Sequence, residues 1–379
     1  MICGIRSSVP QREIFMRQFV LTAAASLVLA GCATHEVDYQ GEGKGFVGAG
    51  ARVQAVLETP SVGTGGGEDA ADDPAIWMGE RPVTVMGTTT AGFVAGTDKK
   101  AGLYVYDFAG NVLQFMPEGL LNNVDAVDLS VSGRSQVVLG ASDRTPDKTG
   151  VSLYIFDPAG TGQNGVRPWG AIRTDVVEPY GFCFARLGGE VHAILVGHEG
   201  EVRQFVLTAD AAGQPVSREV RRFEIGSISE GCAADEATGA LYLAEENVGL
   251  WRYGLAPSSG DARTLIQGLE TDKLVGDAEG LTIIADGEGR YLIGSSQGDS
   301  AFPVWRIDGA APEYKGRFVV EDGAVDGVTG TDGLAALGGH VSDAFPEGLV
   351  VVQDDVNDVG TQNFKYIDWR VIKAALGID

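Results

Sequence analysis

The chain has 379 residues, enough for one large domain or two ordinary ones, and 44% of them are hydrophobic, so it can bury a core. Its 52 acidic residues against 28 Lys and Arg give a formal net charge of −24, which argues against a nucleic-acid partner because such a partner requires a basic face. Only 4 Cys and 4 His are present, so we expect any metal site to be built from carboxylates, which suit Ca²⁺ or Mg²⁺.

Residues 1–31 are predicted to be a lipoprotein signal peptide. The apolar run from Phe19 to Ala30 is too short to span a bilayer and is typical of a signal sequence. It ends in Leu29-Ala30-Gly31-Cys32, which resembles the lipobox in which the cysteine becomes the lipidated first residue. We therefore expect export and a lipid anchor on Cys32, at the outer membrane or facing the periplasm. The alternative is an ordinary signal peptide with an incidental cysteine.

Residues 32–50 are polar and rich in glycine, and they are predicted to be a flexible tether. The folded domain is then expected at 51–379, so that the lipid on Cys32 is the protein's one contact with a membrane. The apolar run Ala51–Leu57 could supply an outer strand to the last repeat unit of this domain. A short helix is predicted at the C-terminus, around Trp369–Leu376.

One pattern then recurs six times along the chain: a short apolar run, a polar residue, a turn containing glycine, and an aromatic-rich run. The copies end 47 to 60 residues apart, at Asp107, Asp157, Leu207, Gly254, Asp308 and Asp368. A lead residue precedes a small apolar strand in each unit: Asp73, Asp125, Tyr180, Glu230, Glu279 and Asp332. Units of about fifty residues with three or four strands each are typical of propeller blades. We therefore predict an all-β, six-bladed β-propeller with a central channel; two β-sandwiches would explain the spacing poorly.

The repeat also predicts where polar side chains gather. Antiparallel neighbours place the start of one strand and the end of the next at the same edge, so these positions should converge around the channel. Most are carboxylates: Asp72, Asp73, Asp98, Asp125, Asp143, Glu199, Glu230, Glu245, Glu246, Asp277, Glu279, Asp332 and Asp354. Bare carboxylates at one mouth would repel one another, which favours bound Ca²⁺ over a solvated acidic rim without an ion.

Four basic residues are interleaved with these acids: Lys99, Lys100, Arg144 and Lys148. Together with cations they indicate an anionic, phosphorylated substrate, although charge balance on loop tips is the simpler alternative. The segment 294–298 matches the GxSxG pattern of serine hydrolases, but a strand follows where that site requires a helix. Water activated by a metal ion is therefore the predicted nucleophile.

Two cysteines, Cys183 and Cys232, lie in the lead strands of adjacent units. A disulfide between neighbouring blades is possible in an exported protein. Two unlinked cysteines, buried as small apolar side chains, are the preferred interpretation.

Ten segments, taken in order from about 58 to 369, resemble the motifs of the β-propeller phytases. They are DAADDPAIW (69–77), DKKAGLYVY (98–106), LNNVD (121–125), EPYGF (178–182), EGCAAD (230–235), LYLAEE (241–246), DAEGLT (277–282), SSQG (295–298), TDG (331–333) and QNFK (362–365). The resemblance implies a six-bladed propeller that removes phosphate from phytate, myo-inositol hexakisphosphate, with calcium as cofactor. The expected protein is a monomer that binds phytate as its calcium complex.

The resemblance also implies roles for single residues. The ligands of the catalytic calcium ions would be Asp72, Glu230, Glu246, Asp277 and Glu279. Structural calcium would bind Asp73 with the carbonyl of Val124 and, separately, Asp332. The scissile phosphate or its metals would contact Lys99, Arg144 and Tyr180, with Lys100, His198 and Glu199 nearby.

At His198 the chain departs from the family, which usually has a lysine there. Lysine is always charged, whereas histidine is mostly neutral at pH 7, so the departure implies weaker or pH-dependent phosphate binding. Two rival functions remain open: another calcium-dependent propeller hydrolase, such as a lactonase or phosphotriesterase, and a propeller that binds a ligand without catalysis.

Overall fold

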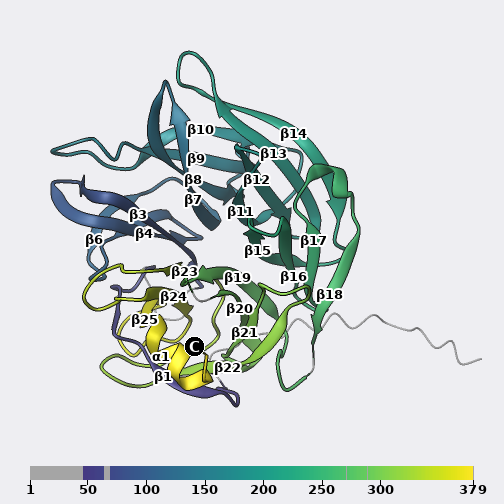
Figure 1. Cartoon of the computed structure of the whole chain (residues 1–379). Helices are drawn as coiled ribbons and strands as arrows, with labels where there is room; N and C mark the ends of the chain where they lie inside the picture. The colour runs from purple at the N-terminus through teal and green to yellow at the C-terminus, as the bar shows by residue number, and fades with distance from the viewer. Residues whose placement is uncertain (1–45, 64–68, 270, 288, 379) are drawn as a thin grey trace, which may run out of the picture. The chain divides into compact units, whose positions relative to one another are not determined.

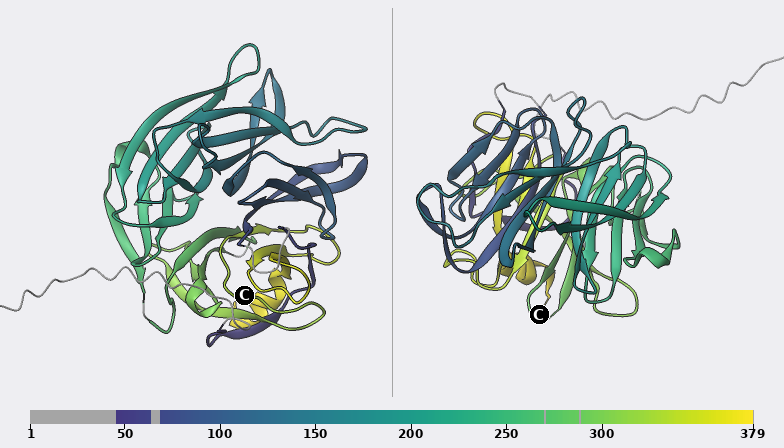
Figure 2. Two further views of the ribbon diagram at one scale, coloured as in Figure 1. Left: turned by 180° about the vertical axis from the view of Figure 1, so that it is seen from behind. Right: turned by 90° about the horizontal axis from the view of Figure 1, so that it is seen from above.

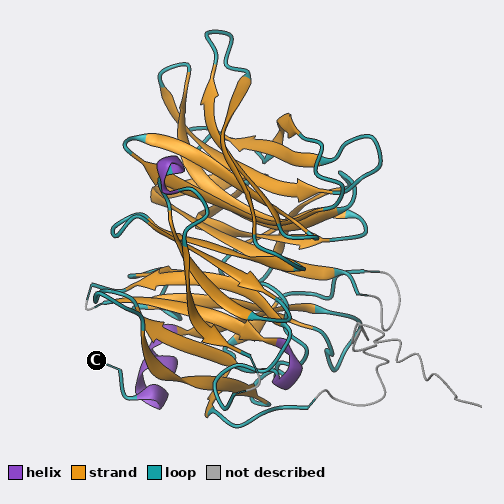
Figure 3. Ribbon diagram, turned by 90° about the vertical axis from the view of Figure 1, so that its right-hand side faces the viewer, coloured by secondary structure: helices purple, strands orange, loops and turns teal. Residues whose placement is uncertain are grey.

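The computed structural model describes residues 46–63, 69–269, 271–287 and 289–378. The predicted signal peptide, Cys32 and most of the predicted tether lie outside these residues. Within them, strands make up nearly all of the regular structure (Figure 3). In the part of the chain that is described, no helix is both long enough and apolar enough to cross a membrane.

The strands form six sheets, the blades of a β-propeller, which confirms the predicted fold (Figures 1 and 2). Blade 1 consists of β3 (Ala71–Val85), β4 (Thr88–Asp98), β5 (Gly102–Tyr106) and β6 (Val112–Met116). Blade 2 consists of β7 (Leu121–Val131), β8 (Arg134–Asp143), β9 (Gly150–Phe156) and β10 (Arg167–Arg173). Blade 3 consists of β11 (Pro179–Leu187), β12 (Glu190–Gly197), β13 (Glu201–Ala209) and β14 (Pro215–Glu224). Blade 4 consists of β15 (Ser229–Asp235), β16 (Ala240–Glu245), β17 (Gly249–Gly254) and β18 (Arg263–Gly268). Blade 5 consists of β19 (Ala278–Ala285), β20 (Arg290–Ser296), β21 (Phe302–Arg306) and β22 (Glu313–Glu321). Blade 6 consists of β23 (Leu334–Gly338), β24 (Gly348–Asp354) and β25 (Asn363–Asp368). Two short 3₁₀ turns, Pro257–Ser259 and Gln297–Asp299, interrupt blades 4 and 5.

The first strand of each blade is its innermost strand. Neighbouring innermost strands contact one another all the way round, from β3 through β7, β11, β15, β19 and β23 back to β3. They surround the predicted central channel, which holds a cavity of about 190 Å³ lined by residues of all six strands. Buried apolar side chains between the blades form the core; Trp77 and Phe93 of blade 1, for example, meet Phe156 of blade 2.

The segment Ala51–Leu57 was predicted to supply an outer strand to the last blade, but it is divided between blades 5 and 6. Strand β1 (Ala51–Gln54) runs parallel to β22 at the outer edge of blade 5. Only β2 (Leu57–Glu58) reaches the last blade, where it pairs antiparallel with β25. Blade 6 has just three strands of its own, so β2 supplies the missing outer strand and joins both ends of the chain in one sheet.

The predicted C-terminal helix is confirmed as α1 (Trp369–Leu376). It begins after Asp368, whose carboxylate accepts a hydrogen bond from the Arg370 amide at 3.0 Å, and ends at Gly377 in the left-handed conformation that glycine permits. Its first residue, Trp369, donates its indole N–H to Asp286 at 2.8 Å, which ties the helix to blade 5.

A disulfide joins Cys183 of β11 to Cys232 of β15. The preferred interpretation of two unlinked cysteines is therefore wrong. Both residues lie in the middle of adjacent innermost strands, with Cα atoms 5.5 Å apart, so their side chains meet across the boundary between blades 3 and 4. The bond lines the central channel.

Candidate active site

A β-bulge opens the innermost strand in five blades. The register shifts after Ala71, Leu121, Pro179, Ser229 and Ala278. The first residue within each bulge is Asp72, Asn122, Tyr180, Glu230 or Glu279, and Asp332 holds the matching place before β23. Bulges re-aim side chains, and here they present five polar groups, to which Asp332 adds a sixth from blade 6. The predicted lead residues are thus correct in blades 3 to 6 and wrong in blades 1 and 2, where Asp73 and Asp125 are replaced by Asp72 and Asn122.

Glycine is the second bulge residue in blades 3 to 5, and Gly333 follows Asp332 at the matching place in blade 6. A Cβ atom at Gly181 would collide with the carbonyl of Glu230, and one at Gly231 would collide with that of Glu279. The backbones of adjacent blades therefore approach at this mouth as closely as glycine allows. This close approach brings side chains from different blades within reach of one another.

Three buried glutamates form the centre of the mouth. One carboxylate oxygen each from Glu230, Glu246 and Glu279 lies within 4.8 Å of the other two. We call these three residues the glutamate cluster. Burial, and then the neighbouring carboxylates of Asp72 and Glu279, raise the pKa of Glu230 well above its usual value. Burial and the nearby Glu230 raise the pKa of Glu246 to about 9.

The cluster could hold a metal ion. Among the described residues, Oδ2 of Asp72, Oε1 of Glu246 and Oε2 of Glu279 are buried carboxylate oxygens without a hydrogen-bond partner. Buried polar atoms normally find partners, and several anionic oxygens converging in one place are what calcium binds. Asp277 lies beside them, half-buried and two residues before Glu279, and burial raises its pKa as well.

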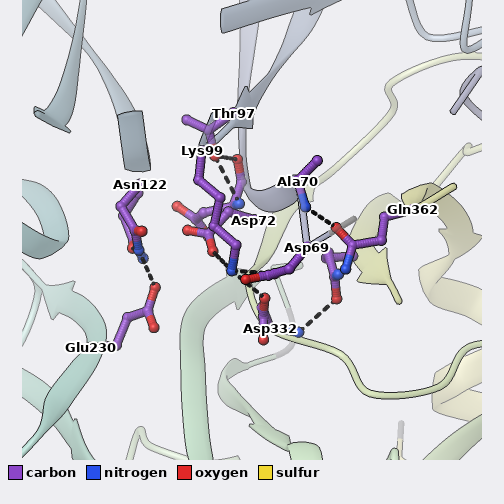
Figure 4. A network of polar contacts seen from close by, with 12 residues as sticks. Asp69, Ala70, Asp72, Thr97, Lys99, Asn122, Glu230, Asp332 and Gln362 are labelled. Atoms are coloured by element: carbon purple, nitrogen blue, oxygen red, sulfur yellow. Dashed lines mark hydrogen bonds and ion pairs between the residues drawn. The ribbon is translucent and has the colours of Figure 1, made fainter. Parts of the chain in front are cut away.

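Lys99 forms the cationic side of the site (Figure 4). Its ammonium group lies 2.7 Å from Asp69, 2.9 Å from Asp72 and 3.2 Å from Asp332. Burial alone would lower its pKa, but the charges of Asp332 and Asp72 outweigh it and raise the pKa well above its usual value, so Lys99 stays charged. The repeat pattern does not single out Asp69 as a site residue, although Asp69 is the first residue of the family motif at 69–77.

Comparison with known proteins shows that this chain is similar to proteins named phytases. The family model described as Phytase matches residues 17–379. A 3-phytase from Bacillus subtilis (strain 168) is 34% identical over 372 residues, covering 95% of this chain and 94% of the relative. The chain belongs to the phytase family. The resemblance to that family, inferred from the motifs, is confirmed.

Similar solved structures are more distant from this phytase-family chain. An exo-β-1,3-galactanase from Phanerochaete chrysosporium has a TM-score of 0.44 and 12% identity, covering 82% of this chain and 81% of its own. A β-propeller domain from Myceliophteria thermophila has a TM-score of 0.38 and 10% identity, covering 73% and 80%. Likenesses at this level bear on neither the fold nor the activity.

The remaining predicted site residues of this phytase-family protein lie around the mouth. The Tyr180 ring lies 5.2 Å from that of His198, whose Nδ1 is 3.0 Å from Glu199 Oε1. Arg144 contacts Glu178 at 3.4 Å. Lys100 and Glu199 are exposed and contact none of the cluster residues within the described part of the chain.

The predicted structural-calcium residues lie in two places. Asp73 accepts a hydrogen bond from the backbone N–H of Val124 at 3.0 Å and lines the channel cavity. Asp332 lies at the mouth, beside Lys99.

Several predicted rim carboxylates of the phytase-family chain bind within their own blades instead. Asp143 accepts a hydrogen bond from Ser152 at 2.6 Å, Glu245 accepts one from the Trp251 indole at 2.7 Å, and Asp354 lies 3.4 Å from Lys365. Each is at the end of a second strand and bonds to the third strand, away from the channel. The prediction that they join the carboxylate ring was therefore wrong.

The raised pKa values predict how the metal-free protein responds to pH. A carboxylate with a higher pKa in the folded state makes folding less favourable as pH rises from the unfolded value to the folded one. For Glu246 that window runs from 4.5 to about 9. We expect the melting temperature of chelator-treated protein to fall between pH 5.5 and 8.5, and saturating calcium to remove most of the fall. A flat profile without calcium would contradict the buried ionisable cluster.

Proposed function

We propose that this protein is a calcium-dependent phytase, which hydrolyses phosphate monoesters of phytate and acts as a monomer. The observation that carries the proposal is the glutamate cluster, built at the channel mouth beside Lys99. Membership of the phytase family and the relative named 3-phytase support the choice of substrate. The other calcium-dependent propeller hydrolases would not need the Lys99 and Arg144 cations, and a binding-only propeller would release no phosphate.

The proposed roles follow from charge and position. The residues that would hold catalytic calcium are Asp72, Glu230, Glu246, Asp277 and Glu279, with structural calcium at Asp73 and Val124 and at Asp332. When bound, calcium supplies charge neutralisation and an activated water. Lys99 and Arg144 are the cations that would bind the phosphate, and Tyr180 presents its ring beside the cluster. Phytate is polyanionic and the chain carries a net charge of −24, so we infer that the substrate enters as its calcium complex.

Lipid anchoring is a further part of the proposal. The lipobox-like end of the apolar run supports a lipid anchor on Cys32 and export to the cell envelope. The tether would then hold the propeller away from the membrane, with the lipid as its one attachment.

The proposed function predicts phosphate release from phytate that requires calcium. We expect activity to be lost on adding a chelator and restored by an excess of Ca²⁺, because the cluster carboxylates repel the substrate when no cation lies between them. Phosphate release is the measurement. A lactone and a phosphotriester, each with and without chelator, test the rival hydrolases. Calcium-dependent turnover of either, without release from phytate, would overturn the assignment.

A further inference from the structure

The glutamate cluster differs from the rest of the mouth in how its charge is balanced. Asp72 and Asp332 both pair with Lys99. None of the ion pairs of the described residues includes Glu230, Glu246 or Glu279. The mouth is therefore divided into a half whose carboxylates pair with a lysine and a half whose carboxylates, among the described residues, form no ion pair.

Asn122 contacts the half of the mouth that has no lysine. It is fully buried at the bulge of blade 2, and its amide Nδ2 donates a hydrogen bond to Glu230 Oε1 at 2.8 Å, across 108 residues of sequence (Figure 4). The other bulge positions carry a carboxylate or, in blade 3, Tyr180. Blade 2 is thus the blade that supplies a neutral amide at this level.

A neutral donor does something here that a lysine would not. It favours the ionised form of the carboxylate it contacts. By holding one carboxylate oxygen it also fixes the orientation of the other, and it adds no positive charge that would compete with a cation. Loss of the donor would leave Glu230 Oε1 buried with one hydrogen bond fewer and the carboxylate free to turn.

We propose that Asn122 is a positioning residue, which acts through Glu230 to prepare the glutamate cluster for a divalent cation. This inference rests on the proposed function for its biological meaning, but cation binding can be measured without turnover. The expected size of the effect is that of other groups that orient a metal ligand, about 10–100-fold in metal affinity.

The experiment is a calorimetric titration of chelator-stripped protein with Ca²⁺. Asn122→Leu keeps the side chain at a similar size but removes the hydrogen-bond donor. We expect this variant to bind Ca²⁺ about 10–100-fold more weakly than the wild type. The weakened site should be the one that the Glu230→Gln variant also weakens. Asn122→Ala, which cannot overfill the site, serves if the leucine variant does not fold. Unchanged binding in a folded variant would overturn the proposal.

Asn363 provides a matched control. It is also fully buried, and its Nδ2 donates to a glutamate, Glu58 Oε2, at 3.0 Å, but it lies in the seam between blade 6 and β2. Asn363→Leu should lower the melting temperature without changing the cation site sensitive to Glu230→Gln. An equal loss at that site in both variants would mean that general destabilisation, not positioning, is responsible.

A double-mutant cycle shows whether Asn122 acts through its partner. In a Glu230→Gln background, Asn122→Leu should cost little further cation affinity, because the carboxylate it orients is gone. Additive losses would overturn the proposed route. If the wild type binds calcium but releases no phosphate from phytate, the proposed function fails, whereas the titrations still decide the role of Asn122.

Discussion

Replacing Glu230 with glutamine should reduce phytate hydrolysis by at least about two orders of magnitude, since metal positioning and charge stabilisation each contribute on that scale. The substitution preserves the shape of the side chain but removes one negative charge from the glutamate cluster. It also leaves the amide of Asn122 facing a neutral group. The measurement is kcat for phosphate release at saturating phytate and saturating free calcium.

Glu245→Gln is the matched control for this variant. Both glutamates belong to blade 4 and are 4% exposed, but Glu245 binds the Trp251 indole within its blade. We expect Glu245→Gln to alter stability more than turnover. Wild-type turnover in Glu230→Gln, or equal losses in the two variants, would show that the cluster is not the catalytic centre.

Removing the disulfide should have the largest effect on stability. Cys183 and Cys232 are 49 residues apart, and the chain-entropy model assigns about 4 kcal/mol to closing a loop of that length. The double variant Cys183→Ala/Cys232→Ala should therefore unfold at clearly lower denaturant concentration than the wild type, with both proteins saturated with calcium.

Reduction provides the control for the disulfide prediction. Wild-type protein that is unfolded and refolded in the presence of a reductant should approach the stability of the double variant, whereas the variant itself should be indifferent to the reductant. Coincident unfolding curves for the oxidised wild type and the variant would mean that the blade contacts alone hold blades 3 and 4 together.

The blades could be predicted because their signals are local. Each contains short strands and turns that repeat about every fifty residues, so the period alone indicates six units. Closure could not be predicted in the same way. Whether a segment such as Ala51–Gln54 pairs with blade 5 or blade 6 depends on which sheet edge is open, and that edge is formed more than 250 residues later.

The residues of the candidate site likewise fall into those that the repeat predicts correctly and those that it does not. Tyr180, Glu230, Glu279 and Asp332 recur in step with the repeat, so the sequence by itself determined that they share one mouth. Asp143, Glu245 and Asp354 recur in step as well, but the third strand of each blade binds them. A repeat specifies how far along its strand a residue lies. The hydrogen-bond partners on the neighbouring strand decide whether its side chain is directed into the mouth or bound within the blade.

The sequence alone therefore determined the fold class, the family and the carboxylate chemistry of the mouth, because each depends on residue types at a regular spacing. Only the tertiary structure decided the partners: Asn122 with Glu230, Lys99 with Asp69 and Asp332, and Cys183 with Cys232. Apart from the contact of Lys99 with Asp69, which lies within blade 1, these contacts cross blade boundaries, where bulges and glycines bring the backbones close. Spacing along the chain carries no information about such distances, because they are set by the closure of the ring.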